Sequence, residues 1–304
     1  MTVDRLETMR VFVAVAEARG FAAAARRLAM SPPAVTRAVA AVERRVGAQL
    51  IRRSTRVVKL TDAGERFLVD CKRILAAVQD AEASAAGAAG ELRGPLTVTA
   101  SVMFGELFVA PLLLDFLALH PLVTVQALLL DRVVDLVEEG VDVAVRIARL
   151  DEKSSAVASR VGWVRAVACA SPAYLANHGA PKRPDDLAIH RAIVFAQGAT
   201  PVGWPFRIDG KVQVVRPPPH LLVNSTAVSV AAAVAGRGIT MALSYQVMRE
   251  LRDGRLVRVL EPFETEEVPI HVLQSEGRRA PARVRAFAKF MVERLRADPS
   301  LRID

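Results

Sequence analysis

The sequence predicts a multidomain α+β protein, with a small, mainly helical N-terminal domain, one long connecting helix and a larger two-lobed α/β domain. Three observations predict this fold class. The N-terminal part holds short helical patterns followed by two β-like pieces. A single long helical pattern comes next, and beyond it apolar strands alternate with helices, as in α/β folds. We expect domains over 1–61, 62–91 and 92–304.

Positive charge is concentrated at the N-terminus. The 304 residues carry a formal charge of +9, and residues 1–65 hold 12 Lys/Arg against 6 Asp/Glu. Most of the excess therefore lies in a small part of the chain. Such a distribution favours an anionic partner for the N-terminal domain.

Cysteine and histidine usage indicates neither a disulfide framework nor a metal site. Cys71 and Cys169 lie far apart and are interpreted as small buried apolar side chains. The five histidines lack metal-ligand spacing, so we expect no metal and no cofactor. The N-terminus lacks a signal-peptide pattern and no apolar run reaches about 18 residues, so we expect a cytoplasmic chain without a membrane span.

Two helical segments are expected before residue 30. The first helix is expected to end at Gly20. Three- and four-residue spacing predicts its apolar face, whose members are Leu6, Met9, Phe12, Val13 and Ala16. The second helix is alanine-rich and covers 21–29.

A third helix is expected from Ser31, as N-cap, to Val46, with Gly47 ending it. Prolines are tolerated in the first turn. A helical wheel predicts a buried stripe of Val35, Val39, Val42 and Val46, and an opposite face of Pro33, Arg37, Ala40 and Arg44. A basic, small-residue face on the second helix of a tight helical pair can enter a major groove. The alternative is an amphipathic helix with a solvated basic face.

Residues 50–60 form two short β-like pieces around a basic turn, which predicts a wing whose arginines reach phosphates or the minor groove. Thr61 and Asp62 are expected to begin the long helix. The spacing of its apolar residues is that of a coiled coil and predicts a dimer helix through Phe67, Cys71, Ile74 and Val78.

The stretch from Phe21 to Gly64 resembles the DNA-binding region of LysR-type transcriptional regulators, a winged helix-turn-helix. The resemblance rests on a pattern that includes Ser31, Thr36, the Val42-Glu43 pair and Gly47. Two positions depart from it: Pro32 stands where the family usually has glutamine, and Ala38 where it often has a polar groove-reading residue. The operator preference is then unusual, or recognition depends more on the wing and DNA shape. Together with the outer face and the wing, the candidate DNA-binding residues are Ser31, Pro32, Pro33, Ala34, Thr36, Arg37, Arg44, Arg52, Arg53 and Arg56.

From residue 92 on, strands are expected over 96–100, 123–130, 141–147, 164–170, 191–195, 221–223, 239–242 and 268–273, and helices over 107–119, 133–139, 172–177, 225–235, 245–252 and 281–296. Continuous apolar strands separated by helices predict parallel sheets covered on both sides. No GxGxxG, GxxxxGK[ST] or GxSxG motif occurs in a strand–helix setting.

Three stretches, Val141–Leu150, Ser171–Leu187 and Asn224–Val247, resemble the effector-binding domain of the same family. The resemblance implies a Rossmann-like fold of the periplasmic-binding-protein type II, with a ligand cleft between two lobes. We expect lobe I over 92–163 and 268–304 and lobe II over 164–267. The chain would cross near 163–165 and 266–269.

Helix starts that follow strands predict the effector site, because open α/β sheets bind ligands beyond the carboxyl ends of their strands. Ser101 and Asn224 to Thr226 hold such positions, and Arg146 ends a third strand. Two unpaired helix N-termini, hydroxyls and a guanidinium predict an anion, a carboxylate. The alternatives are ordinary N-caps and a structural ion pair. The candidate residues are Ser101, Val102, Met103, Phe104, Arg146, Phe195, Asn224, Ser225 and Thr226.

The sequence thus predicts a transcription factor that binds a pseudo-palindromic double-stranded operator and a small-molecule effector, and assembles as a homodimer or homotetramer. Two alternatives are a transport solute-binding protein and an α/β enzyme. The first lacks a signal peptide and has an extra basic domain. The second lacks a nucleophile–base pattern and a cofactor loop, so we expect no enzyme activity.

Overall fold

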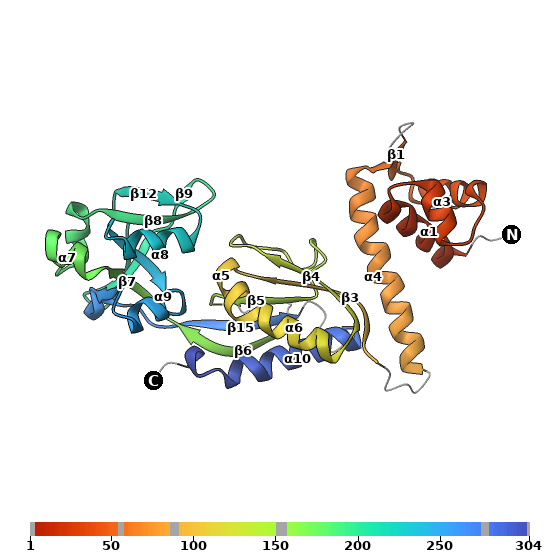
Figure 1. The fold of residues 1–304 in the computed structure, drawn as a ribbon. Helices are drawn as coiled ribbons and strands as arrows, with labels where there is room; N and C mark the ends of the chain where they lie inside the picture. Colours follow the sequence, from red (N-terminus) through yellow and green to blue (C-terminus); the bar gives the residue numbers. More distant parts are fainter. Residues whose placement is uncertain (1–3, 54–57, 86–90, 150–156, 275–279, 303–304) are drawn as a thin grey trace. The chain divides into compact units, whose positions relative to one another are not determined.

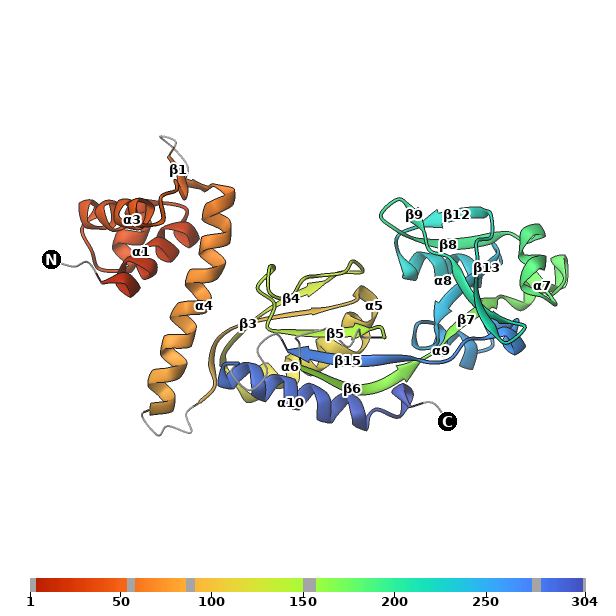
Figure 2. The same cartoon turned by 180° about the vertical axis from the view of Figure 1, so that it is seen from behind.

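The computed structural model describes residues 4–53, 58–85, 91–149, 157–274 and 280–302. The chain divides into two compact units, residues 1–95 and 96–304, and each is described by itself. Figure 1 shows the elements of both units, and Figure 2 shows them from behind.

The first unit contains the predicted winged helix-turn-helix and long helix. Its elements are α1 (Arg5–Ala18), α2 (Phe21–Arg27), α3 (Pro32–Val46), β1 (Ile51–Arg53), β2 (Val58–Leu60) and α4 (Asp62–Ala85). Strands β1 and β2 pair antiparallel, with Ile51 opposite Leu60. The predicted start and end of α3 are confirmed: the Ser31 side chain accepts from the Ala34 N–H, and Gly47 follows the helix with φ 73°.

Two details of this unit differ from the prediction. Helix α1 buries Val11, Ala14 and Val15 beside Phe12, because it packs against α2, α3 and α4 together and needs a broader apolar face. The other members of the predicted face are only partly buried. The helix ends at Arg19 in the left-handed conformation, while Gly20 is the N-cap of α2.

The valine stripe of α3 is confirmed at Val35, Val39 and Val42, which are fully buried, but Val46 is 42% exposed. Val46 lies in the last turn, beyond the helices that cover the other three. Ala38 takes its place in the core, with 8% exposure. The buried face of α3 is therefore shifted toward the helix start.

The predicted dimer stripe of α4 is wrong in its first half. Cys71 is fully buried in the core of its own unit, and the ring of Phe67 lies 5.3 Å from the ring of Phe12. These side chains pack on α1 and are not free for a second chain. Two apolar side chains of α4 stay exposed to solvent: Ile74 is 37% exposed and Val69 is 44% exposed.

Lobe I of the second unit is built on a five-stranded sheet in the order β4-β3-β5-β15-β6. Helix α10 (Ala282–Ala297) runs alongside β15 and β6 in both views (Figure 1, Figure 2) and packs on α6 (Ala110–Leu119) through Phe287 and Phe116. The strands are β3 (Arg93–Ala100), β4 (Leu122–Leu129), β5 (Val143–Ile147), β6 (Val157–Val164) and β15 (Val268–Gln274).

Lobe II is built on the strand order β12-β8-β13-β7-β14, with β9 beside β8. Its strands are β7 (Ala166–Ala170), β8 (Ala192–Gln197), β9 (Thr200–Pro201), β12 (Pro219–Val223), β13 (Ile239–Leu243) and β14 (Val257–Val259). Its helices are α7 (Pro172–His178), α8 (Thr226–Val234) and α9 (Ser244–Arg252), and a hairpin, β10 (Trp204–Ile208) and β11 (Lys211–Val215), completes it.

The expectation of wholly parallel sheets is wrong. The pairs β3/β5, β8/β12 and β8/β13 are parallel, whereas β6 and β15 pair antiparallel in lobe I, and β7 is antiparallel to β13 and β14. The antiparallel strands β6, β7 and β15 flank the two points where the chain passes between the lobes. A strand that returns from the other lobe runs against its neighbour, which a βαβ pattern does not predict.

The predicted helix over 133–139 is also wrong: this segment is a turn. The Asp135 carboxylate accepts from the N–H groups of Val137 and Glu138, and Gly140 follows with φ 63°. Such local side-chain bonds compete with helix formation.

The predicted helix over 107–119 begins earlier. Residues 102–104 form α5 (Val102–Phe104), a π-turn covers Gly105–Val109, and α6 continues to Leu119. In the described residues this helical run, Val102–Leu119, is long and apolar enough to cross a membrane by length and composition alone. Phe104, Val109 and Phe116 on it are buried in the protein, so it serves as a core helix here.

Candidate DNA-binding surface and effector site

The exposed face of α3 carries most of the candidate DNA-binding residues. Ser31, Pro32 and Pro33 are exposed at its first turn, Ala34 and Thr36 are partly exposed, and Arg37 and Arg44 are exposed further along. Arg37 makes no hydrogen bond or ion pair within the described residues, so its guanidinium is available to a partner. Ala38, one of the two departures from the family pattern, lies on the buried face with 8% exposure.

The wing brings two cations together. Arg52 on β1 stands directly opposite Lys59 on β2, and both are exposed. Like charges at opposed positions of a hairpin destabilise it unless an anion lies nearby. This pair is therefore suited to a DNA phosphate. Arg56 lies outside the described residues, and of Arg53 only the backbone in β1 is described.

Two polar residues fix the wing to the helices. The Glu43 carboxylate accepts from the N–H groups of Leu50 and Ile51. The Thr61 hydroxyl donates to the Gln49 carbonyl at 2.7 Å and accepts from the Gly64 N–H at 3.0 Å. Glu43 belongs to the family pattern quoted above, and here it positions the wing together with Thr61.

In lobe I, the structure brings Ser101 and Arg146 to neighbouring strand ends. Strands β3 and β5 are parallel and Ala100 is opposite Val145, so the next residue of each strand is a candidate. Arg146 donates from Nη2 to the Thr99 hydroxyl at 3.0 Å. Burial lowers the pKa of Arg146 and the nearby charge of Arg132 adds to the effect, while the charges of Asp131 and Glu139 oppose it.

In lobe II, Phe195 and Asn224 come together in the same way. Strands β8 and β12 are parallel, and Val223 is opposite Phe195. Asn224 is exposed, and Ser225 and Thr226 are partly exposed where α8 begins. The structure therefore gathers the candidates at the carboxyl ends of parallel strands in each lobe.

The N-cap alternative does not account for the two serines. Ser101 and Ser225 hold N-cap positions, yet neither side chain makes a capping hydrogen bond. The Tyr245 phenol lies near Ser101, and burial raises the pKa of Tyr245 although hydrogen bonds to Gln246 and Ser101 oppose the rise.

Two effector-site expectations are wrong. Phe104 is fully buried: its ring stacks on Phe108 at 4.7 Å and meets the edge of Tyr245 at 5.3 Å. It is a core residue and cannot flank a flat ligand, whereas Val102 and Met103 stay partly exposed. The helix N-terminus at Val102 is also not free, because its N–H donates to the Asp131 carboxylate at 3.0 Å.

Asp131 and Gln197 are residues that the sequence reading missed. The Asp131 carbonyl accepts from Gln197 Nε2 of lobe II at 3.2 Å, so this segment contacts both the helix start and the other lobe. The position of Asp131 directly after an apolar strand was the available signal.

Fold and sites together define a class: a DNA-binding protein with a winged helix-turn-helix, joined to a two-lobed domain that holds a small molecule. The sequence model of the LysR-family helix-turn-helix matches residues 6–65, and that of the LysR substrate binding domain matches 89–296. The chain belongs to the LysR family of transcriptional regulators.

Individual proteins agree with this assignment. The probable regulator LtrA of Klebsiella pneumoniae is 31% identical over 96% of both chains. The structure of CrgA, a LysR-type regulator from Neisseria meningitidis, is 28% identical, covers 97% of this chain and 99% of its own, and superposes with a TM-score of 0.60. Full-length LysG from Corynebacterium glutamicum with bound effector Arg shares the fold, with 21% identity, 95% and 99% coverage and a TM-score of 0.60.

The protein is therefore a transcriptional regulator that binds DNA through its helix-turn-helix, binds a small-molecule effector and forms oligomers, as LysR-type regulators do. Its family consists of transcriptional regulators and not of enzymes. The transport and enzyme alternatives are set aside.

Proposed function

We propose that this regulator binds a pseudo-palindromic operator through α3 and the wing, and that a small carboxylate bound at Arg146 changes that binding. The observation that carries the effector's chemistry is the Arg146 guanidinium. It is partly buried, its hydrogen bond goes to a neutral hydroxyl, and it makes no direct ion pair within the described residues, where the charges of Asp131 and Glu139 act on it only without contact. A carboxylate would supply a direct partner and can accept two parallel N–H bonds from an arginine.

Other hydrogen-bond donors among the candidate residues also favour an anionic ligand. The Ser225 hydroxyl is not used in capping, and the Ser101 hydroxyl bonds to the Tyr245 phenol and not to the helix start. The first N–H groups of α8, a helix of 9 residues, have no acceptor among the described residues. Orphan N–H groups and the helix dipole both favour an anion. Thr226 adds a hydroxyl, Asn224 an amide and Phe195 an apolar surface at the adjoining strand ends.

For the organisation of the chain, we infer a DNA-binding domain over 1–61, a linker helix and hinge over 62–91, and an effector domain over 92–304 that is divided into the two lobes. The exposed Val69 and Ile74 of α4 are the surface we propose for a dimer contact. Pairing of effector domains would extend the dimer to a tetramer. The proposed location is the cytoplasm.

Thermal denaturation of the full chain with a panel of small carboxylates and their matched amides tests the effector proposal. A true effector at 100 times its Kd stabilises the folded protein by about 2.7 kcal/mol. We expect stabilisation by an acid but not by its amide, and loss of it in Arg146→Gln. Arg149→Gln is the control, because Arg149 lies on the same segment and already pairs with Glu266 at 3.0 Å. Equal stabilisation by acid and amide, or an unchanged response in Arg146→Gln, would overturn the proposal.

A further inference from the structure

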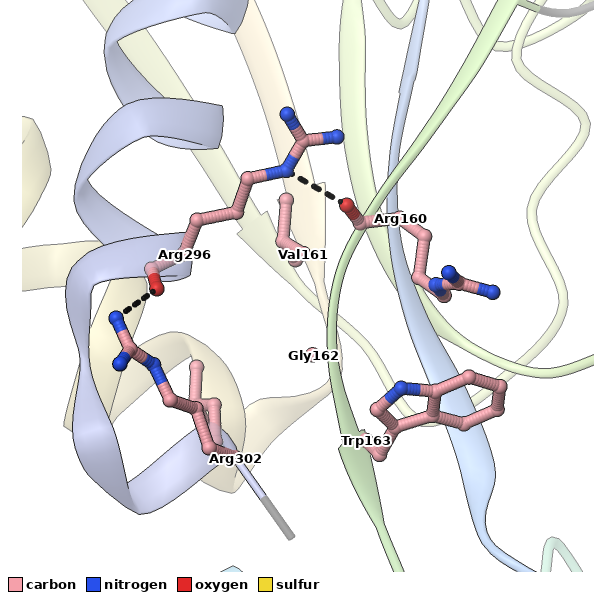
Figure 3. A pocket seen from close by; sticks show the side chains of 7 residues that line it. Arg160, Val161, Gly162, Trp163, Arg296 and Arg302 are labelled. Carbon is pink, nitrogen blue, oxygen red and sulfur yellow. Dashed lines mark hydrogen bonds between the residues drawn. The ribbon is translucent and has the colours of Figure 1, made fainter.

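A second basic site lies on the outer edge of lobe I. A pocket of about 390 Å³ opens beside β6, the edge strand of the sheet. Its walls come from three separate segments: β6, the last turn of α10, and the short turn Pro299–Leu301 with the residue after it. Figure 3 shows Arg296 and Arg302 on one side of β6, and Arg160 with Trp163 on the other.

The backbone makes room for this arrangement. A Cβ atom on Gly162 would lie 2.6 Å from the Leu301 carbonyl oxygen, so only glycine lets the C-terminal turn approach the strand this closely. Leu301 is fully buried in that contact. The pairing of β6 with β15 shifts between Ile270 and His271, which places an extra residue in β6 at the pocket. Such a bulge re-aims neighbouring side chains.

The three arginines are held in place by neutral groups. Arg296 Nε donates to the Arg160 carbonyl at 3.0 Å, and Arg302 Nη2 donates to the Arg296 carbonyl at 3.0 Å (Figure 3). The Arg160 guanidinium lies 4.7 Å from the centre of the Trp163 ring. Each guanidinium has five N–H donors, so most of its hydrogen-bonding capacity is left over.

No acidic side chain lines the pocket, and within the described residues none of these arginines makes an ion pair. Two carboxylates close in sequence are engaged elsewhere. Glu293 pairs with Lys289 at 3.8 Å, and Asp298 accepts from the N–H and the hydroxyl of Ser300. Within the described residues, the guanidinium groups of Arg296 and Arg302 on one side of β6, and of Arg160 on the other, thus have no carboxylate partner.

We propose that this pocket binds the phosphate group of a small phosphorylated metabolite. A phosphate has oxygens in several directions and up to two negative charges, which suits the two guanidinium groups of Arg296 and Arg302 on the same side of β6. A carboxylate carries one charge and two oxygens in one plane, so it matches this pair less well. The Trp163 face is already covered by Arg160, so the pocket recognises charge and not an aromatic ring.

Fluorescence titration and calorimetry on the full chain, at constant ionic strength, test this site. The probes are inorganic phosphate, a sugar phosphate and a nucleoside diphosphate, with chloride as the reference ion. Trp163 lies in the pocket and reports binding, while a Trp163→Phe chain identifies any signal from Trp204. We expect saturable binding of at least one probe; whether inorganic phosphate binds as well as the esters shows which source of phosphate the site takes.

Variants locate the binding. Arg296→Gln and Arg302→Gln should each weaken it by about tenfold or more, since hydrogen bonds to charged groups are worth about 1.5–3 kcal/mol. Arg294→Gln is the matched control, because that arginine is on the same helix but lies over Phe290, outside the pocket. Arg37→Gln controls for phosphate bound at the DNA-binding surface. Absence of saturable binding, or equal loss in Arg294→Gln and Arg296→Gln, would overturn the proposal.

Discussion

The Glu43 carboxylate accepts a hydrogen bond from the Leu50 N–H at 2.9 Å, and the same oxygen accepts from Ile51 at 3.1 Å. A side chain in the last turns of α3 therefore holds the start of the wing. Glu43→Ala should destabilise the N-terminal unit by about 1.5–3 kcal/mol, because two buried N–H groups lose a charged acceptor. Glu43→Gln, which keeps an acceptor oxygen, should cost less. Thermal denaturation of both variants measures this, and equal losses would argue against a hydrogen-bonding role.

Gly64→Ala should disrupt the junction of the wing and α4. A Cβ atom there would lie 2.0 Å from the Leu50 carbonyl oxygen, and a backbone atom cannot move away as a flexible side chain can. We expect a loss of more than about 2 kcal/mol and a large loss of DNA binding. Gly20→Ala is the control, since its Cβ would keep an ordinary 3.7 Å contact. Similar stability of the two variants would contradict the geometry.

Arg37 and Arg52 should contribute differently to DNA binding. Arg37→Ala should weaken operator binding by about 1–3 kcal/mol and random DNA less, if it reads a base edge from α3. Arg52→Ala should weaken both alike and reduce the salt slope, as a phosphate contact does. Gel shifts at several salt concentrations separate the two. An Arg37→Ala chain that loses both affinities equally would make Arg37 a backbone contact.

Glu17 links three helices of the N-terminal unit. It pairs with Arg27 of α2 at 3.0 Å and with Lys72 of α4 at 2.9 Å. Partial burial acts to raise the pKa of Glu17, but the hydrogen bonds and charges of Lys72 and Arg27 outweigh it and hold that pKa below its ordinary value.

Because the folded pKa of Glu17 is lowered, its contribution is present above the unfolded value of about 4.5 and is lost as pH falls through the folded pKa. The side chain is 38% exposed, so the contribution should not exceed about 1 kcal/mol. Wild type should therefore be more stable than Glu17→Gln at pH 7, and the difference should shrink in acid. Urea unfolding at pH 7 and below pH 4.5 measures it; a constant difference would contradict the ion-pair account.

Both thiols should resist modification in the folded chain. Burial raises the pKa of Cys71 to about 12 and of Cys169 to about 12. At pH 8 the thiolate, which is the reactive form, is nearly absent. A colorimetric thiol reagent should react with neither until denaturant is added. Fast reaction of Cys71 in the native protein would show that α4 separates readily from α1.

Local signals predicted α3 well, because its boundaries depend on neighbouring residues: Ser31 caps it, two prolines open it and Gly47 ends it. The same kind of signal failed over 133–139, where the Asp135 side chain stabilises a turn instead. Apolar spacing on α4 predicted a buried stripe but not its partner, since Phe67 and Cys71 pack on α1 of their own chain. The direction of β6 and β15 depends on how the chain returns between lobes, which no local pattern records.

The clustering of the candidate effector residues at strand ends was predictable, because β3, β5, β8 and β12 are parallel neighbours. The hydrogen bonds around these residues were not predictable. The sequence predicts an unpaired N–H group at Val102. In the structure this N–H donates a hydrogen bond to Asp131, a residue 29 positions away in the chain. Phe104 is a candidate by its position after a strand, but its packing against Phe108 and Tyr245, which the sequence does not show, makes it a core residue.

That bond has a consequence for how the regulator responds to its surroundings. The Asp131 carboxylate already accepts a hydrogen bond from the Val102 N–H at a helix start. An acidic metabolite would therefore have to compete with Asp131 for this N–H group. Abundant weak acids gain little there, because the exchange replaces one carboxylate with another. At the effector site proposed above, a ligand would need additional contacts, at Arg146 or the α8 start, before displacement became favourable. The Asp131 side chain would then set an affinity threshold that excludes simple anions.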